Sequence, residues 1–309
     1  MTSDTLPKTA LASVINIQKA AHTLRGIIPE TPLLENINLS DKYGAQIYLK
    51  REDLQPVRSY KIRGAYYKIS GLSSEDLQKG VVCASAGNHA QGVAFACNRL
   101  QVRGVIFMPN PTPKQKVNQV NMFGKDRVEI KLCGDTFDDA YAEAKAYCER
   151  NQMTFIHPFD DPKVIEGQGT VGMEIFSQMS QDIDYIILPV GGGGLSAGVG
   201  SYIKQVSPQT KIIGVEPEGA PTMQRSLEKG QVTTLDHIDK FVDGAAVQRV
   251  GQLNFKICQQ VLDEVITVPE GKVCSTILKL YNEEAIVVEP AGSLSIAALD
   301  FLKGRPDFR

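Results

Sequence analysis

Residues 185–215, YIILPVGGGGLSAGVGSYIKQVSPQTKIIGV, decide the expected fold. An apolar run, Tyr185–Val190, precedes a glycine-rich turn, a segment with apolar residues at helical spacing, Leu195–Val206, and a second apolar run, Lys211–Val215. Short apolar runs bounded by turn residues are typical of buried strands, and helical spacing is typical of amphipathic helices. The stretch therefore predicts a strand–helix–strand unit, from which parallel sheets are built.

The same alternation extends over much of the chain. We expect strands at Val81–Ala84, Val102–Met108, Arg127–Leu132, Thr154–Ile156 and Ala285–Val288, and helices at Ile62–Ile69, Asn88–Leu100, Lys114–Phe123, Phe137–Arg150 and Ala291–Leu302. The pattern predicts an α/β fold of two open, twisted, mostly parallel sheets flanked by helices. A smaller lobe, residues 54–157, would be inserted in a larger lobe of residues 1–53 and 158–309, with Pro158–Pro162 as a crossing. A ligand would then lie in the cleft between the lobes, at the carboxyl ends of strands.

Composition excludes several classes of protein. The chain has 309 residues, a net charge of −2 and 42% hydrophobic residues, which gives no reason to expect nucleic acid or an anionic membrane as a partner. It contains no apolar stretch of the roughly 20 residues that span a bilayer, and Met1–Ala10 is polar and lacks a signal peptide. The six cysteines form no Cys-x-x-Cys pair, which indicates reduced thiols of a cytoplasmic protein.

One lysine has surroundings that suggest chemistry. Lys61 lies in Ser59-Tyr60-Lys61-Ile62-Arg63-Gly64-Ala65, among apolar and aromatic residues at an expected helix start. An ammonium there would be poorly solvated, so its pKa should fall towards that of a free, nucleophilic amine. Such an amine can form a Schiff base with an aldehyde cofactor. The alternative is an ordinary surface lysine at a helix start.

The four consecutive glycines after Val190 predict an anion site. In Gly191-Gly192-Gly193-Gly194-Leu195, a run of backbone N–H groups would meet a helix N-terminus, where a phosphate is the natural ligand. No Gly-Lys-[Ser/Thr] follows, so this is not a nucleotide P-loop. A dinucleotide fingerprint is the alternative, because Gly192, Gly194 and Ala197 satisfy G-x-G-x-x-A and Glu216 ends the next expected strand. That reading would make the protein an NAD-dependent dehydrogenase.

A second loop, Ser85-Ala86-Gly87-Asn88-His89-Ala90-Gln91-Gly92, also joins an expected strand to an expected helix. Its free N–H groups could receive a carboxylate, with Ser85 and Asn88 as additional donors. A helix cap formed by Ser85 or Asn88, with no ligand, explains the same residues. His89 is interpreted as a structural hydrogen-bonding residue rather than as a base.

Two acidic motifs are weaker candidates. Glu289-Pro290-Ala291-Gly292-Ser293 joins an expected strand to a helix, and a site role and an ordinary helix start explain it equally well. Glu216-Pro217-Glu218-Gly219-Ala220 could offer the Glu216 carboxylate and the Ala220 carbonyl to a cation, although a solvated turn is the preferred interpretation. We therefore expect no metal.

Together these motifs resemble the pyridoxal-phosphate enzymes of fold type II, the tryptophan-synthase β group, and within it the threonine dehydratases, also called threonine deaminases. The resemblance covers nearly the whole chain, from Glu30-Thr31-Pro32-Leu33 and Lys50-Arg51-Glu52-Asp53 to Glu289-Pro290-Ala291-Gly292. It implies pyridoxal 5'-phosphate in the cleft, with Lys61 as its carrier and the catalytic residue.

The resemblance also assigns roles to the remaining residues of the two loops. Asn88 would contact the hydroxyl of the cofactor ring, Tyr60 would pack against the ring, and Glu289 would belong to the cofactor site. Gly191, Gly192, Gly193, Gly194 and Leu195 would hold the phosphate, and Ser85, Ala86, Gly87, Asn88 and His89 would receive the substrate carboxylate.

The implied reaction is elimination of water from L-threonine followed by hydrolysis to 2-oxobutanoate and ammonia, the first step towards isoleucine, with side activity on L-serine. In the similar serine racemases a serine occupies the position of Ala86, so elimination is favoured over racemisation. The stretches Thr112–Val117 and Phe241–Ala245 look closer to biosynthetic than to catabolic serine/threonine dehydratases. From a different class, a non-catalytic amino-acid-binding protein is the remaining alternative.

Similar proteins also carry further features that bear on the C-terminal end. They continue beyond the helix expected at Ala291–Leu302 into a strand and a Ser-Gly-Gly-Asn-like turn, whose serine meets the pyridine nitrogen. Biosynthetic members add a regulatory region. The sequence ends at Arg309 before both, so the resemblance implies either a chain trimmed short or another group at the ring nitrogen. It also implies a homodimer or homotetramer.

Overall fold

The structure is a computed structural model that describes residues 11–305 and 308. Met1–Ala10, where we expect a polar segment without a signal peptide, lies outside the described residues, as does Arg309. No helix of the described residues has the length and apolar character needed to cross a membrane.

The first large sheet has four parallel strands. They are β3 (Val81–Ala84), β4 (Gly104–Met108), β5 (Val128–Leu132) and β6 (Thr154–Phe155), in the order β5-β4-β3-β6. Residues of β3 alternate between two cores: Val81 and Cys83 pack with α3 (Lys61–Ser70) and α5 (Asn88–Leu100), whereas Val82 and Ala84 pack with α7 (Phe137–Arg150). Helices thus cover both faces, which is why the central strands β3 and β4 read as continuous apolar runs.

The second large sheet has three parallel strands. They are β7 (Tyr185–Pro189), β8 (Lys211–Pro217) and β9 (Glu264–Val268), in that order. Its Ile186 and Leu188 pack with α8 (Pro162–Gln178) and α9 (Gly194–Val206), while α12 (Glu270–Glu284) and α13 (Pro290–Ala297) cover the opposite face. Two open, mostly parallel sheets flanked by helices are therefore confirmed.

The remaining elements connect and cover these sheets. They are α1 (Val14–Leu24), the antiparallel pair β1 (Leu33–Glu35) and β2 (Tyr48–Lys50), α2 (Ile37–Tyr43), η1 (Glu52–Leu54), α4 (Ser74–Lys79), α6 (Lys114–Gly124), η2 (Lys125–Arg127), α10 (Thr222–Lys229), α11 (Gln252–Val261) and α14 (Leu299–Leu302). The β1–β2 pair, β9 and several of these helices were not among the predicted elements.

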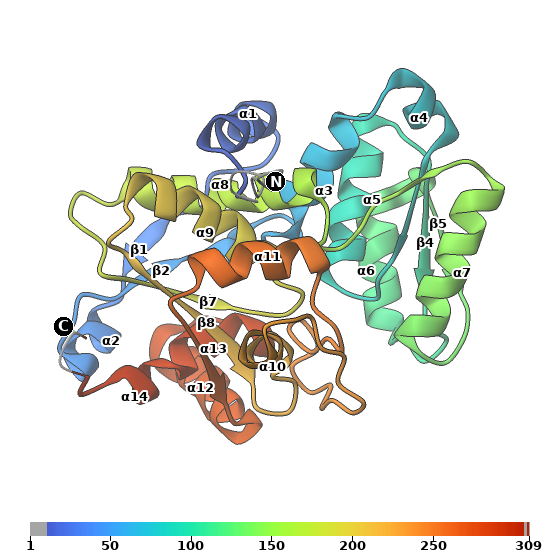
Figure 1. The fold of residues 1–309 in the computed structure, drawn as a ribbon. Helices are drawn as coiled ribbons and strands as arrows, with labels where there is room; N and C mark the ends of the chain where they lie inside the picture. The colour runs from blue at the N-terminus through green and yellow to red at the C-terminus, as the bar shows by residue number, and fades with distance from the viewer. Residues whose placement is uncertain (1–10, 306–307, 309) are drawn as a thin grey trace, which may run out of the picture.

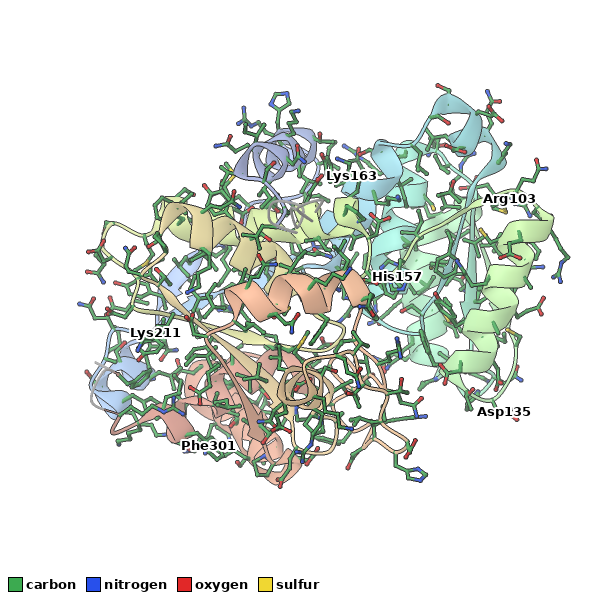
Figure 2. All side chains as sticks on the ribbon, in the orientation of Figure 1. Arg103, Asp135, His157, Lys163, Lys211 and Phe301 are labelled. Atoms are coloured by element: carbon green, nitrogen blue, oxygen red, sulfur yellow. The ribbon has the colours of Figure 1, made fainter. Side chains whose placement is uncertain are left out.

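The two sheets lie side by side and meet through closely packed helices. Figure 1 shows α4 to α7 around the first sheet on the right, and β7 and β8 with α9, α11, α12 and α13 on the left. Between them α3 packs on α8, where a Cβ on Gly64 would lie 2.8 Å from the Val164 carbonyl oxygen. Gly64, three residues after Lys61, is therefore required by the close crossing of α3 and α8. His157, labelled in Figure 2, lies at this junction, whereas Arg103 and Asp135 lie at the far right.

One predicted strand is wrong. Ala285–Val288 pairs with none of the described strands, and Val287 is 74% exposed. Ala285 ends α12 in the left-handed conformation, with φ 53°, and the Ile286 N–H donates back to the Leu280 carbonyl at 2.9 Å. The start of the apolar run thus closes the helix instead of entering a sheet. The helix expected at Ala291–Leu302 is also divided, into α13 and α14.

Candidate active site

Lys61 is the first residue of α3, and its side chain faces a cavity between the two sheets. Its Nζ donates a hydrogen bond to the Pro158 carbonyl at 2.8 Å and lies 5.7 Å and 5.9 Å from the ring centres of Tyr60 and Phe159. Burial lowers the pKa of the Lys61 amine to about 8, while the charge of Glu289 acts in the opposite direction. Part of the residue stays accessible where it lines the cavity, but desolvation still prevails.

A cluster of buried charged side chains anchors the first turn of α3 to neighbouring elements. Arg63 is 1% exposed and donates to Glu52 at 2.7 Å and 2.9 Å and to Glu174 at 2.8 Å. Lys50 also donates to Glu174, at 2.6 Å. A bidentate guanidinium–carboxylate pair is geometrically demanding, and breaking a buried one typically costs about 3–5 kcal/mol. This cluster therefore sets the direction of the helix that carries Lys61.

The loop of residues 85–89 follows β3 and begins α5. Ser85 Oγ accepts from the Gly87 N–H at 3.2 Å, and Gly87 is an N-cap residue without a side-chain cap. Asn88 instead turns to Glu289 and donates to its Oε1 at 2.7 Å. Neither Ser85 nor Asn88 therefore caps α5. Within the described residues, no acceptor pairs with the N–H groups of Ala86, Asn88 and His89.

Glu289 joins the site through this contact with Asn88. It is the N-cap residue of α13 and lines the same cavity as Lys61. The residue is exposed, but surrounding protein raises the pKa of its carboxyl, and the bond from Asn88 opposes that shift. Glu289 thus both begins a helix and lines the candidate site, so the two interpretations of its motif hold together.

His89 does not face the site as a base. It is 3% exposed, and its Nε2 lies 2.9 Å from the Ile156 carbonyl oxygen, to which it can only donate. Burial lowers the pKa of its imidazole to about 3, so the ring is neutral at physiological pH. His89 is a structural hydrogen-bonding residue, as predicted.

The glycine loop lies between β7 and α9, at the carboxyl end of a strand. Gly193 has φ +90°, and a Cβ on Gly192 would lie 2.4 Å from the ring of Phe159. Glycine is therefore required at these two positions. Among the described residues no acceptor pairs with the N–H groups from Gly191 to Leu195, and Ser196 Oγ is buried without a partner. The loop thus presents unpaired donors at a helix N-terminus, which suits a phosphate.

The dinucleotide alternative assigns Glu216 to a ribose hydroxyl, and the structure uses that residue otherwise. Glu216 is 0% exposed, and its two carboxylate oxygens accept from the N–H groups of Met223 at 2.7 Å and Gln224 at 2.9 Å. It therefore caps α10 and is not free for a ribose. Burial raises the pKa of its carboxyl to about 8.

The hydrogen bonds that Glu216 accepts from Met223 and Gln224 also disfavour a cation site at Glu216 and Ala220. No metal-binding cluster of three or more acidic, histidine or cysteine side chains occurs in residues 11–305 and 308.

Three groups near the loops were missed by the sequence analysis. The ring of Phe159 packs against Gly192 and its Cβ and main chain against Gly194, and the Pro158 carbonyl accepts a hydrogen bond from the Lys61 amine. The position of Pro158–Pro162 just after β6 was a usable signal, because ligands gather at the carboxyl ends of strands. Asn254 contacts the Gly192 carbonyl from α11 and carries no local sequence signal.

An ion pair joins the two segments that were singled out as typical of biosynthetic relatives. Lys116 of α6 pairs with Asp243, which lies in the stretch between α10 and α11. Both residues line the cavity that also contains Lys61 and Asn88. The pair therefore bridges the cavity close to the Asn88–Glu289 contact.

The predicted amine, the two predicted anion-binding loops and Glu289 all lie at one cavity. Lys61, the Ser85 loop, Glu289 and the first part of the glycine loop line it. The arrangement offers an amine of lowered pKa, a set of N–H groups for an anion and a second set about the glycine loop. The residues present thus suit a phosphorylated aldehyde.

Comparisons with known proteins agree with this geometry. The family described as pyridoxal-phosphate dependent enzyme matches residues 24–307. The chain is 59% identical to "L-threonine dehydratase biosynthetic IlvA" of Halalkalibacterium halodurans, over 92% of this chain and 68% of that protein.

Solved structures show the same similarity. The processed form of threonine deaminase isoform 2 from Solanum lycopersicum is 42% identical, with a TM-score of 0.87, over 96% of this chain and 88% of that one. Maize serine racemase is 30% identical, with a TM-score of 0.91, over 96% of this chain and 89% of that one. Fold and family are thus shared, and the reaction has to be argued from individual residues.

Proposed function

Because this chain belongs to the family of pyridoxal-phosphate dependent enzymes, we propose that it eliminates water from L-threonine and that hydrolysis of the product takes up a water and yields 2-oxobutanoate and ammonia. The observation that carries the proposal is the 59% identity to a biosynthetic threonine dehydratase over 92% of this chain. That name also supports a place in isoleucine synthesis. Side activity on L-serine belongs to the proposal, because a missing methyl group is worth only about 1–3 kcal/mol of discrimination.

The cofactor would occupy the cavity that contains Lys61. When bound, pyridoxal phosphate supplies an aldehyde that condenses with amines and a ring that spreads the charge left after loss of a proton. Lys61 would hold the aldehyde, and the N–H groups of Gly191–Leu195, with the N-terminus of α9, would hold the phosphate. Asn88 would reach the ring hydroxyl, with Tyr60 and Glu289 beside the ring.

The substrate would bind at the loop that begins α5. The unpaired N–H groups of Ala86, Asn88 and His89 would receive its carboxylate. Burial lowers the pKa of the released Lys61 amine to about 8, so a usable fraction of it is neutral and would take the proton from Cα at Nζ. Ala86 offers no hydroxyl that could return a proton from the other side, and this supports elimination over racemisation.

The test of this function is product analysis of the cofactor-loaded protein. We expect 2-oxobutanoate and ammonia in equal amounts from L-threonine, pyruvate from L-serine and no D-serine. D-Serine as the main product would identify a racemase. Binding of NAD with no visible cofactor spectrum would support a dehydrogenase. Retention of an amino acid without release of ammonia would indicate a binding protein.

The lowered pKa of Lys61 predicts how the cofactor-free protein reacts with pyridoxal phosphate at different pH values. Only the neutral amine is nucleophilic, and the pKa is about 8. The rate of Schiff-base formation should therefore rise as pH increases from 7 to 9 and level off above this range. Visible absorbance in stopped flow measures it. A free alkylamine, with an ordinary pKa near 10.4, is the control and should still be accelerating at pH 9.

Several features remain part of the proposal. They include a smaller lobe of residues 54–157 inserted in a larger one, a cytoplasmic homodimer or homotetramer, and the biosynthetic rather than catabolic role. The two sheets, in residues 81–155 and 185–268, support the division into lobes.

A further inference from the structure

Asn254 connects the two halves of the cofactor site. Its Nδ2 donates to the Gly192 carbonyl at 2.8 Å and to the Phe159 carbonyl at 3.1 Å. Gly192 belongs to the loop whose N–H groups are unpaired. Phe159 follows Pro158, whose carbonyl oxygen accepts a hydrogen bond from the Lys61 amine at 2.8 Å. One buried amide thus ties the proposed phosphate loop to the segment that contacts Lys61.

The orientation of this amide is fixed by its partners. Both contacts are carbonyl oxygens, so only the NH₂ group can face them, and a flipped amide would place oxygen against oxygen. Asn254 is 0% exposed, and its Oδ1 is buried without a hydrogen-bond partner. A buried unpaired oxygen destabilises the fold. The side chain therefore keeps its two donor contacts in spite of a cost in stability.

The helix that carries Asn254 is itself anchored to the same segment. Asp160 Oδ1 accepts from the N–H groups of Leu253 at 3.0 Å and Asn254 at 3.1 Å, and Oδ2 accepts from Gln252 at 2.9 Å. A carboxylate at a helix N-terminus is favourable both as a cap and through the helix dipole. The N-terminus of α11 is therefore tied to the segment of Phe159 and Asp160 by four hydrogen bonds.

We propose that Asn254 is a positioning residue that holds the glycine loop in its phosphate-binding shape, in register with Lys61. The inference rests on the proposed function, because it takes the loop as the phosphate site. Without the Asn254 amide, the Gly192 carbonyl would keep just one donor among the described residues, the Gly251 N–H at 3.2 Å. The peptide units of the loop could then rotate, and their N–H groups would no longer converge. Asn254 itself would touch no reacting atom.

The test compares two ligands that differ only in the phosphate. Cofactor-free wild-type protein and Asn254→Ala are titrated with pyridoxal phosphate and with pyridoxal, and visible absorbance gives both dissociation constants. We expect the Kd for pyridoxal phosphate to rise about tenfold or more in the variant. The Kd for pyridoxal, which does not use the loop, should change less than about twofold. Asn254→Ser, which retains one short donor, should fall between the wild type and Asn254→Ala.

Phe255→Leu is the matched control on the same helix. Phe255 is 3% exposed and packs in the adjoining core without a bond to the glycine loop. This variant should melt at a lower temperature yet keep the wild-type ratio of the two dissociation constants. An unchanged ratio in Asn254→Ala and Asn254→Ser would overturn the positioning role. A wild-type protein that does not prefer pyridoxal phosphate to pyridoxal would overturn the phosphate assignment on which the inference rests.

Discussion

Lys61→Ala should abolish the release of 2-oxobutanoate from L-threonine, with a loss of at least roughly a thousandfold in kcat. The substitution removes the amine that would hold the aldehyde and accept the Cα proton, so two functions are lost together. His89 cannot replace it, because its ring is turned to the Ile156 carbonyl and a pKa of about 3 makes its imidazole a weak base. A coupled assay for 2-oxobutanoate measures the loss. Sodium borohydride should fix the cofactor covalently to the wild-type protein and not to the variant.

Lys68→Ala is the control for Lys61→Ala. Lys68 lies on the same helix and pairs with Asp161 at 2.8 Å, away from the cavity. Its removal costs an ion pair, worth about 1 kcal/mol or less at a partly exposed site, and should leave kcat close to the wild-type value. Substantial activity in Lys61→Ala would refute the role assigned to this lysine.

Gly192→Ala should weaken the binding of pyridoxal phosphate about 5-fold to 150-fold. The new Cβ would lie 2.4 Å from the Phe159 ring, closer than real Cβ atoms approach. The ring has little room to withdraw, because the Phe159 carbonyl is bonded to Asn254 and the Phe159 main chain packs closely against Gly194. Overpacking of this kind typically costs about 1–3 kcal/mol, and here the glycine loop must absorb it.

Gly271→Ala serves as the control for the added methyl group. A Cβ on Gly271, in α12, meets nothing within 4 Å. This variant should bind pyridoxal phosphate normally and be as stable as the wild type or slightly more so, because alanine favours helix. Equilibrium titration of both cofactor-free variants gives the comparison. Equal affinities for Gly192→Ala and Gly271→Ala would contradict the phosphate assignment of the loop.

The parts of the site that follow strands could be predicted from the sequence. The Ser85 loop and the glycine loop each come directly after an apolar run, so periodicity locates them at the carboxyl edges of β3 and β7. Lys61 could be singled out by its apolar neighbours. The strand–helix alternation predicted the two sheets because strands buried on both faces have a strong local pattern.

Other features depend on contacts between residues far apart in the chain. Asn254 meets Gly192 across 62 positions, and Asn88 meets Glu289 across 201. No local pattern encodes such pairs. The strand expected at Ala285–Val288 failed for a related reason: four apolar residues are compatible with a strand, but the Ile286 N–H is already used to end α12. Periodicity does not report which partner a backbone group will choose.

The charged cluster around Arg63 has a consequence for the electric field near Lys61. Two cationic groups, on Lys50 and Arg63, face two carboxylates, on Glu52 and Glu174, so the group carries no net charge. The opposite charges offset one another at Lys61, whose pKa shift comes from desolvation and from Glu289. The ion pairs thus hold α3 in place without a net charge that would shift the pKa of Lys61. A single neutralising substitution in the cluster would leave an uncompensated charge, so mechanical support and proton affinity would change together.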